Sequence, residues 1–468
     1  MYKHKIIASG IIMMLGAPLS AVAGDGAEMQ QIRKEINALK QGYEARIQAL
    51  ELRLQKAEAA SSAAESHAAQ AEAAVSQAVA AQPAQASAAP ADNINAFNPG
   101  VSLILSGLYS NHSRDPAGFA ITGFHLPSDV MADLRPQRGF SLAESELGIY
   151  ASVDQLFYGG LNFAIHPDNS VSTEEAFIQT TALNHGLTVK AGRFFSGIGY
   201  LNEQHAHVWD FVDAPLAYQA FLGGQMNNDG LQLRWLAPTD TYLELGAEVG
   251  RGGSFPGTGR DKNGSGASAL FAHLGGDVGA SNSWRAGLSL LTTSPQDRQW
   301  DDTSLGGAPV TNSFNGNSKL WIADAVWKWA PNGNAYYTNF KLQGEYLRRV
   351  EDGSLVYDLN GAAVPGSYAA TQSGWYLQGI YQFAPYWRAG LRTERLDPGS
   401  VDYGVNNAAL SRPDFRPTRQ SLMVDYNPSE FSRIRLQFAQ DKAAQGAPDN
   451  QIFLQYQMSL GAHGAHKY

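Results

Sequence analysis

The chain has 468 residues, a net charge of −9 and no cysteine, and only 16% of its residues are charged. The acidic balance provides no basic surface for a nucleic acid, and the low charged fraction is unlike that of a disordered chain. The lack of cysteine excludes a disulfide framework and thiolate metal sites.

The first 23 residues are typical of a cleaved secretory signal peptide. Basic residues at positions 3–5 precede the apolar run Ile6–Leu15, and Ala21–Ala23 form a small-residue cleavage site. A membrane anchor is the alternative, but the apolar run is too short to span a bilayer. No later run approaches the roughly 18 apolar residues that a spanning helix needs, so a membrane-embedded mature chain would have to be a closed barrel.

Residues 24–57 have the spacing of a periplasmic coiled coil. Apolar positions recur at intervals of three and four with one stutter. They are Met29, Ile32, Ile36, Leu39, Tyr43, Ile47, Leu50, Leu54 and Ala57. So narrow an apolar stripe needs a partner helix to cover it. Isoleucine in the seam favours a coiled coil of three helices, so we expect self-association as a homotrimer. The alternative to a coiled coil is a single helix on the barrel rim. The composition of residues 58–97, which are rich in Ala, Ser and Gln, predicts a linker between this helix and the barrel.

Residues 98–468 alternate between apolar and polar side chains, which indicates β-strands with two different faces. In the last segment Leu454 and Tyr456 lie on one face, and Gln455 lies on the other. Sixteen segments are predicted: 100–111, 140–153, 157–166, 174–183, 186–194, 229–237, 240–251, 267–277, 281–292, 318–330, 336–349, 372–384, 386–396, 417–427, 430–440 and 449–462. A soluble sandwich and a transmembrane barrel both produce such alternation.

The links between these segments distinguish a barrel from a sandwich. Tight turns alternate with longer links, which we place at 112–139, 167–173, 195–228, 252–266, 293–317, 350–371, 397–416 and 441–448. Short turns at one rim and long loops at the other are typical of an outer-membrane barrel. We therefore predict an all-β transmembrane barrel of about 16 antiparallel strands in the cell outer membrane, with an N-terminal α-helical coiled coil. The even strand number places both barrel ends on the periplasmic side.

The link 195–228 is expected to fold inward and narrow the barrel, by analogy with the loop at this position in general porins. The candidate constriction residues are Tyr200, Glu203, His205, His207, Trp209, Asp210 and Asp213. His205 and His207 share a face if the backbone is extended, and with the nearby carboxylates they are candidate contacts for a metal or a metal chelate. The alternative is that these polar groups hold the loop against the barrel wall.

The polar faces of the predicted strands carry charges of both signs into the lumen. They are Glu144, Glu146, Glu175, Glu244, Glu248, Glu345 and Glu394, with Lys190, Arg234, Arg285, Lys341, Arg388, Arg392, Arg433 and Arg435. The basic residues cluster on late strands and the acidic ones on early strands, so a transverse field would orient dipolar solutes. The acidic residues argue against a pure anion channel. The alternative is that these charges pair and keep the lumen hydrated.

The sequence lacks the common catalytic motifs, namely a nucleophile elbow, a P-loop, an H-E-x-x-H helix and a Rossmann glycine run. His166 beside Asp168 is a pair of reactive types near a strand end, but such pairs are common in loops. We expect neither an enzyme nor a cofactor, and no nucleic-acid partner.

Three segments resemble coiled-coil-bearing outer-membrane proteins grouped with legiobactin-receptor-type siderophore porins. They are GRFFSGIGYLNEQHAHVWDFVDAPLAYQAFLGGQ (192–225), DGLQLRWLAPT (229–239) and SLGAHGAHKY (459–468). The resemblance covers most of 98–468, and relatives are often labelled zinc-regulated or TonB-dependent receptors. It implies passage or binding of metal chelates or other small solutes. The stretch between Ala23 and the barrel is too short for the plug domain of a true TonB-dependent receptor.

We therefore expect an outer-membrane porin or channel for diffusion of small hydrophilic solutes, surrounded by outer-membrane lipids. Its cargo would be a small solute or a metal chelate such as a siderophore complex. The alternatives are a ligand-binding receptor for a metal or siderophore with little open conductance, and a structural or adhesive barrel.

Overall fold

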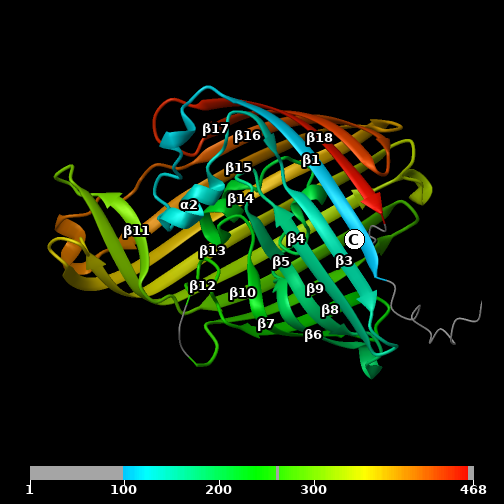
Figure 1. Cartoon of the computed structure of the whole chain (residues 1–468), viewed down its shortest axis with the longest axis horizontal. Coiled ribbons are helices and arrows are strands. Elements are labelled where there is room, and N and C mark those ends of the chain that lie inside the picture. Colours follow the sequence, from blue (N-terminus) through cyan, green and yellow to red (C-terminus); the bar gives the residue numbers. More distant parts are fainter. Residues whose placement is uncertain (1–98, 260–262, 462–468) are drawn as a thin grey trace, which may run out of the picture. The chain divides into compact units, whose positions relative to one another are not determined.

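The computed structural model describes residues 99–259 and 263–461. They form one antiparallel sheet that closes into a barrel where β1 (Gly100–His112) pairs with β18 (Asp449–Gly461), as Figure 1 shows. The predicted closed barrel is confirmed. The predicted signal peptide 1–23, coiled coil 24–57 and linker 58–97 lie outside the described residues.

The other strands pair with their neighbours in chain order. They are β2 (Gly139–Leu142), β3 (Ser145–Ser152), β4 (Phe157–Ile165), β5 (Val171–Thr180), β6 (Leu187–Phe195), β7 (Asn227–Leu236), β8 (Tyr242–Gly250), β9 (Ala267–Val278), β10 (Asn282–Thr293), β11 (Arg298–Thr303), β12 (Pro309–Trp329), β13 (Asn339–Tyr357), β14 (Val364–Ala384), β15 (Trp387–Asp402), β16 (Thr418–Ser429) and β17 (Ser432–Lys442).

The helices among the described residues are short. They are α2 (Ser128–Leu134), α3 (Leu216–Leu222) and the 3-10 turns η2 (Pro116–Gly118), η3 (Asn184–Gly186), η4 (Ala206–Val208), η5 (Pro331–Gly333) and η6 (Gly404–Ala408). None of these helices is long and apolar enough to cross a membrane.

The 18 strand segments occupy sixteen positions around the barrel, because two strands are interrupted. β2 and β3 both pair with β1, and the strand that they form is interrupted at Ala143 and Glu144. β10 and β11 both pair with β12, in register along its length. The predicted number of sixteen strands is therefore confirmed, although the predicted segment 140–153 consists of two pieces.

The barrel has the inverse polarity of a soluble protein. On β18, Leu454 and Leu460 are 48% and 45% exposed on the outside, whereas Gln455 and Gln457 are 7% exposed and point inward. The same division holds on β17, where Leu436 is exposed and Gln437 is buried. Apolar side chains facing out and polar side chains facing in are what a barrel surrounded by lipid requires.

Two predicted loops are wrong in large part, and a third is wrong at its start. The segments 293–317 and 350–371 consist mostly of β11 and of long extensions of β12, β13 and β14, and residues 397–402 of the predicted loop 397–416 extend β15; these extensions project beyond the other strands (Figure 1). Their tight turns lie at 304–308 and 358–363. A separate apolar core stabilises this projecting sheet: Trp300, Val310, Phe314, Leu355, Tyr368, Ala370, Val401, Tyr403 and Leu410. The alternation of apolar and polar residues in the sequence did not indicate this apolar core.

An arginine at the middle of the outer surface should destabilise the barrel. We expect Leu454→Arg to lower the free energy of unfolding from lipid vesicles by about 2–4 kcal/mol, because the guanidinium would face the bilayer midplane. The matched control Leu460→Arg, near the strand end, should cost about 0–1 kcal/mol. Urea titrations of refolded protein measure both values. Equal costs at the two positions would contradict the lipid-facing assignment.

Candidate functional site

Residues 196–226, which we call the inward loop, connect β6 to β7 and fold into the barrel. The Asn202 side chain holds the two ends of this loop together. Its Nδ2 donates to the carbonyls of Ser196 and Met226, both at 2.8 Å, and its Oδ1 accepts from the Met226 amide at 2.8 Å. Ser196 also donates to Glu248 on β8 at 2.6 Å, and the Gly197 amide donates to the same carboxylate at 2.8 Å. The base of the loop is therefore fixed to the barrel wall.

Two aspartates of the inward loop bind the basic wall opposite. Asp210 contacts Lys341 and lies 3.2 Å from Arg388. Asp213 lies 2.8 Å from Arg392 and 2.7 Å from Arg419. These contacts link the loop to β13, β15 and β16, so it crosses the lumen.

The ion pairs keep both aspartates ionised despite their burial. Burial alone would raise each pKa, but Lys341 and Arg388 hold the pKa of Asp210 well below its usual value. Likewise, Arg392 and Arg419 outweigh burial and lower the pKa of Asp213 to about 2. Both aspartates are therefore negatively charged at neutral pH.

Backbone groups of the inward loop also bind inward-facing side chains. Glu345 accepts hydrogen bonds from the amides of Tyr200 and Leu201, at 3.2 and 3.0 Å. The carbonyl of Trp209 accepts from Arg433 at 3.1 Å and from Arg435 at 2.7 Å. The inward loop therefore contacts the residues of the late strands that were predicted to line the lumen. They are Lys341, Glu345, Arg388, Arg392, Arg433, Arg435 and Glu394.

An apolar core fills part of the barrel interior. All seven residues of α3 are buried, and the helix contacts β13, β14 and β15. The first long loop folds over it, with Phe124 packed edge-to-face on Phe221 at 5.5 Å and with Val130 and Leu134 of α2 against the same core. Apolar burial of this size holds α3 and the first loop together. The sequence did not predict this core, because neither loop showed strand-like alternation.

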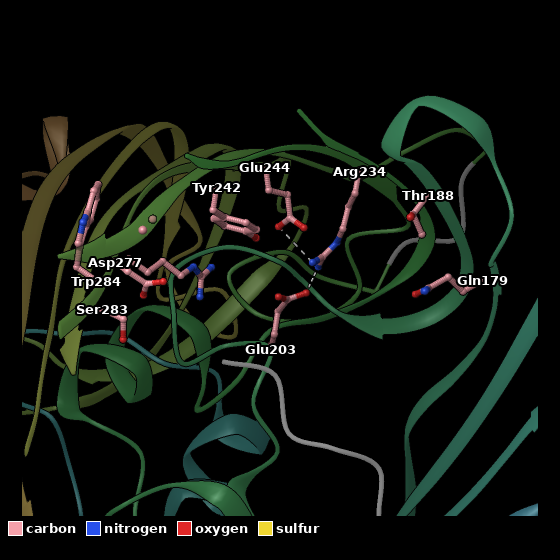
Figure 2. A pocket seen from close by; sticks show the side chains of 12 residues that line it. Gln179, Thr188, Glu203, Arg234, Tyr242, Glu244, Asp277, Ser283 and Trp284 are labelled. Atoms are coloured by element: carbon pink, nitrogen blue, oxygen red, sulfur yellow. Dashed lines mark hydrogen bonds and ion pairs between the residues drawn. The ribbon is translucent and has the colours of Figure 1, made fainter. Parts of the chain in front are cut away.

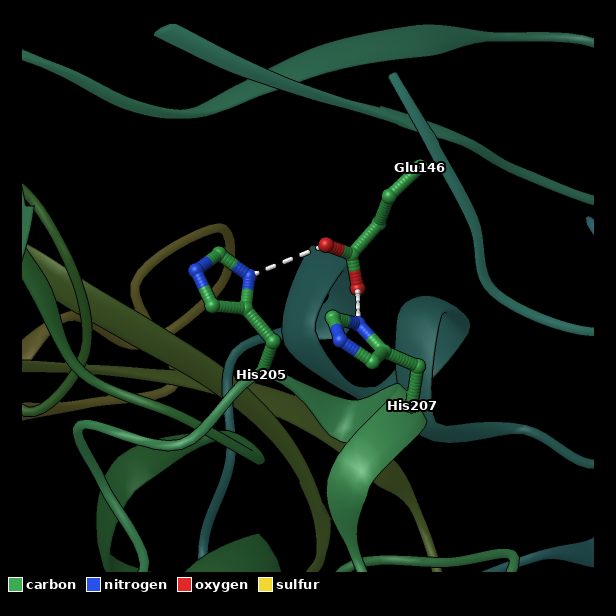
Figure 3. Close-up of side chains that lie close together, drawn as sticks. All are labelled: Glu146, His205 and His207. Carbon is green, nitrogen blue, oxygen red and sulfur yellow. Dashed lines mark hydrogen bonds and ion pairs between the residues drawn. The ribbon is translucent and has the colours of Figure 1, made fainter. Parts of the chain in front are cut away.

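The two histidines of the inward loop lie in an acidic cluster (Figure 3). His207 Nδ1 is 2.6 Å from one oxygen of Glu146, and His205 Nδ1 is 3.1 Å from the other. His205 Nδ1 is also 3.2 Å from Glu174, and its Nε2 is 3.0 Å from Glu175. Burial opposes a charged imidazole, but the hydrogen bonds to Glu146, Glu174 and Glu175 outweigh burial and raise the pKa of His205 well above its usual value.

A β-bulge explains why two consecutive glutamates both reach His205. Glu175 pairs with Asn162 and Thr173 pairs with Phe163, so Glu174 is an extra residue in β5. A bulge of this kind interrupts the alternation of side chains between the two faces. Sequence reasoning placed Glu175 in the lumen but missed Glu174, since strict alternation directs it outward.

Strands β5–β10 and the inward loop line a partly open cavity of about 570 Å³ (Figure 2). Arg234 lies between Glu203 of the loop, which it contacts, and Glu244 of β8, at 3.4 Å. The other residues lining the cavity are Gln179, Thr188, Tyr242, Gly275, Gly276, Asp277, Ser283, Trp284 and Arg285. The wall of this cavity therefore carries charges of both signs.

The remaining predicted lumen residues occupy varied positions. Lys190 is buried over the Phe177 ring, 4.3 Å from its centroid, and Glu248 holds the loop base. Glu144 lies in the break between β2 and β3 rather than within a strand. Sequence reasoning also missed Arg419, although its place in the alternation of β16 would have indicated it.

No family model matches the chain. A protein of Aquifex aeolicus (strain VF5), described as uncharacterized, is 30% identical over 398 aligned residues, and the match covers 80% of this chain and 80% of that one. The two proteins belong to one family.

Several solved outer-membrane proteins are similar in structure. Vibrio cholerae OmpT has a TM-score of 0.48 and 11% identity, covering 78% of this chain and 98% of that one. The Acinetobacter baumannii channel DcaP has a TM-score of 0.45 and 13% identity, covering 78% and 97%. An anion-selective porin from Comamonas acidovorans has a TM-score of 0.45 and 12% identity, covering 78% and 100%. The barrel architecture itself rests on the strand pairings described above.

Removing the charge of Asp213 should loosen the inward loop. We expect Asp213→Asn to destabilise the loop by about 3 kcal/mol, because Arg392 and Arg419 lose a buried ionic partner. Protease cleavage within 196–226 should then be about 100-fold faster. The control Asp229→Asn breaks an exposed pair with Arg193 and should cost less than about 1 kcal/mol. Similar cleavage rates in the two variants would contradict the anchoring role.

The inward loop should also respond to acid in a defined pH window. A lowered folded-state pKa means that the Asp213 carboxylate stabilises the loop above its ordinary pKa of 3.8, and that this stabilisation is lost as the pH falls towards about 2. The protection of loop amides against hydrogen exchange, measured by mass spectrometry and corrected for the pH dependence of intrinsic amide exchange, should be unchanged from neutral pH to about pH 4 and should fall below it. Release of the loop between pH 5 and 7 would contradict this mechanism.

Proposed function

We propose that this protein is an outer-membrane channel through which small hydrophilic solutes diffuse. The observation that carries the proposal is the inverted polarity of a closed barrel, apolar towards its surroundings and polar inside. A barrel of sixteen strands is wide enough to contain an aqueous passage. The inward loop crosses the lumen to the late strands, and the cavity along β5–β10, which Glu203 of the loop also lines, offers a route beside it.

The lining of this route favours solutes that are polar without a strong net charge. Glu203, Glu244 and Asp277 face the same cavity as Arg234 and Arg285. A ring of charged side chains of one sign selects ions of the opposite sign. A lining with charges of both signs orients dipolar solutes and discriminates only weakly between cations and anions. We infer weak charge selectivity.

The finer parts of the proposal concern cargo and assembly. The resemblance to siderophore porins supports metal chelates among the solutes. β1 begins and β18 ends at the same rim as the short turns, which in outer-membrane barrels is the periplasmic rim. We propose that residues 24–57 form a periplasmic coiled coil and join three chains into a homotrimer.

A second candidate function is a receptor with little open conductance. The buried core of α3 and the first loop favours it, because apolar side chains occupy space that a wide pore would fill with water. Such a barrel would bind a metal or chelate rather than pass solutes freely.

Planar-bilayer recording on the purified protein separates the two functions. A channel should give stepwise, ohmic conductance, and Arg285→Gln should move the reversal potential in a salt gradient towards cation selectivity, since it removes a positive charge from the cavity. The control Arg395→Gln lies on the outward face of β15 and should leave the reversal potential unchanged. A protein that inserts but stays silent would overturn the channel proposal.

A further inference from the structure

Six potential metal-binding side chains converge where the inward loop meets β3 and β5. Glu146 projects from β3, Glu174 and Glu175 from the bulge in β5, and His205 and His207 from the loop. Glu144, from the break before β3, is close enough to Glu174 and Glu146 to complete a second group of three ligands. Segments separated in sequence thus bring four carboxylates and two imidazoles together.

We propose that Glu146, His205 and His207 bind a divalent transition-metal ion of the zinc type, which fastens the inward loop to the early strands. This site is independent of whether the barrel conducts. The same three residues are labelled in Figure 3.

The donor atoms are spaced for such an ion. The ligand atoms of these three residues all lie within 4.8 Å of one another. A tetrahedral zinc ion with bonds of about 2.0–2.1 Å keeps its ligands about 3.3 Å apart. The two imidazoles are 2.6 and 3.1 Å from different oxygens of Glu146, and no two ligand atoms are more than 4.8 Å apart, so shifts of roughly 1–2 Å would bring all three groups to the spacing around the ion.

The donor types select the class of metal. Imidazole nitrogen and carboxylate oxygen suit zinc and its first-row neighbours, whereas magnesium and calcium prefer oxygen ligands alone. Three protein ligands leave a fourth position, which Glu174 on the bulge can fill.

The surroundings of His205 match those of a metal-bound histidine. Its Nδ1 faces Glu146 and Glu174, while its Nε2 lies 3.0 Å from Glu175. Metal-ligating histidines usually donate their second ring N–H to a carboxylate, which fixes the tautomer and orients the ring. Glu175 is therefore a positioning residue for His205 rather than a ligand.

The charge of the cluster gives an independent reason for a bound cation. Carboxylate oxygens of Glu144, Glu146 and Glu174 lie within 4.8 Å of one another, and Glu144 Oε1 is a buried oxygen without a hydrogen-bond partner. Carboxylates crowded together away from water repel one another unless protons or a cation neutralise them. A divalent ion between these groups and the imidazoles would offset that repulsion.

Metal titration of the detergent-solubilised full-length protein tests the site. After removal of metals with a chelator, the protein should bind one Zn²⁺ per chain, and Co²⁺ should give the strong visible absorption of a tetrahedral site. Mg²⁺ should not compete. Failure to bind Zn²⁺ and Co²⁺ at micromolar concentrations, or displacement of Zn²⁺ by Mg²⁺, would overturn the proposal and leave shared protons as the neutralising species.

Variants locate the bound ion. The double variant His205→Ala/His207→Ala should weaken Zn²⁺ binding more than ~100-fold, and Glu175→Gln should weaken it about 10–100-fold, because the acceptor that orients His205 loses its negative charge. The control His166→Ala alters a histidine that directly follows β4 and contacts Ser172 at 2.7 Å, and this variant should bind Zn²⁺ as the wild type does. If the double variant does not fold, Glu175→Gln carries the test. Unchanged affinity in Glu175→Gln together with unchanged affinity in any folded histidine variant would overturn the assignment.

Discussion

The pairing of β1 with β18 is the constraint on which the rest of the molecule depends. A strand at a sheet edge leaves its amide and carbonyl groups without partners, and in lipid no water can satisfy them. Eleven residue pairs, from Ser102–Gly461 to His112–Gln451, close this edge. Closure also separates two environments, so every strand must present one face to lipid and the other to the interior.

The interior is then governed by electrostatics rather than by apolar packing alone. Arg392 and Arg419 are almost completely buried on the late strands, where unpaired guanidinium groups would be costly. Glu394 lies 2.8 and 2.9 Å from these two groups, and Asp213 of the inward loop supplies the second carboxylate. The basic wall and the loop thus stabilise each other: the wall determines where the loop lies, and the loop neutralises the wall. The acidic cluster around His205 holds the opposite side of the same loop.

The strand positions were accessible from sequence because a two-residue period records which environment each side chain faces. Leu454, Gln455 and Tyr456 follow that period, and β18 was placed almost to the residue. The period failed in the projecting sheet, where the consecutive residues Asn312, Ser313 and Phe314 of β12 are all buried. The two-residue period also failed at Glu174. This residue is inserted as a bulge, so its side chain points to the face opposite to the one that strict alternation predicts.

By itself, the sequence determined the closed barrel, its sixteen strands and many of the charged residues that point inward, because alternation is a local property. It also indicated that residues 195–228 carry the polar groups of greatest interest. Only the tertiary structure decided which of those groups meet. Contacts between the inward loop and the barrel wall join Asp213 with Arg392, Tyr218 with Glu345, and His205 with Glu175. Such contacts depend on how a loop packs inside a closed wall, and no periodicity in the chain encodes that path.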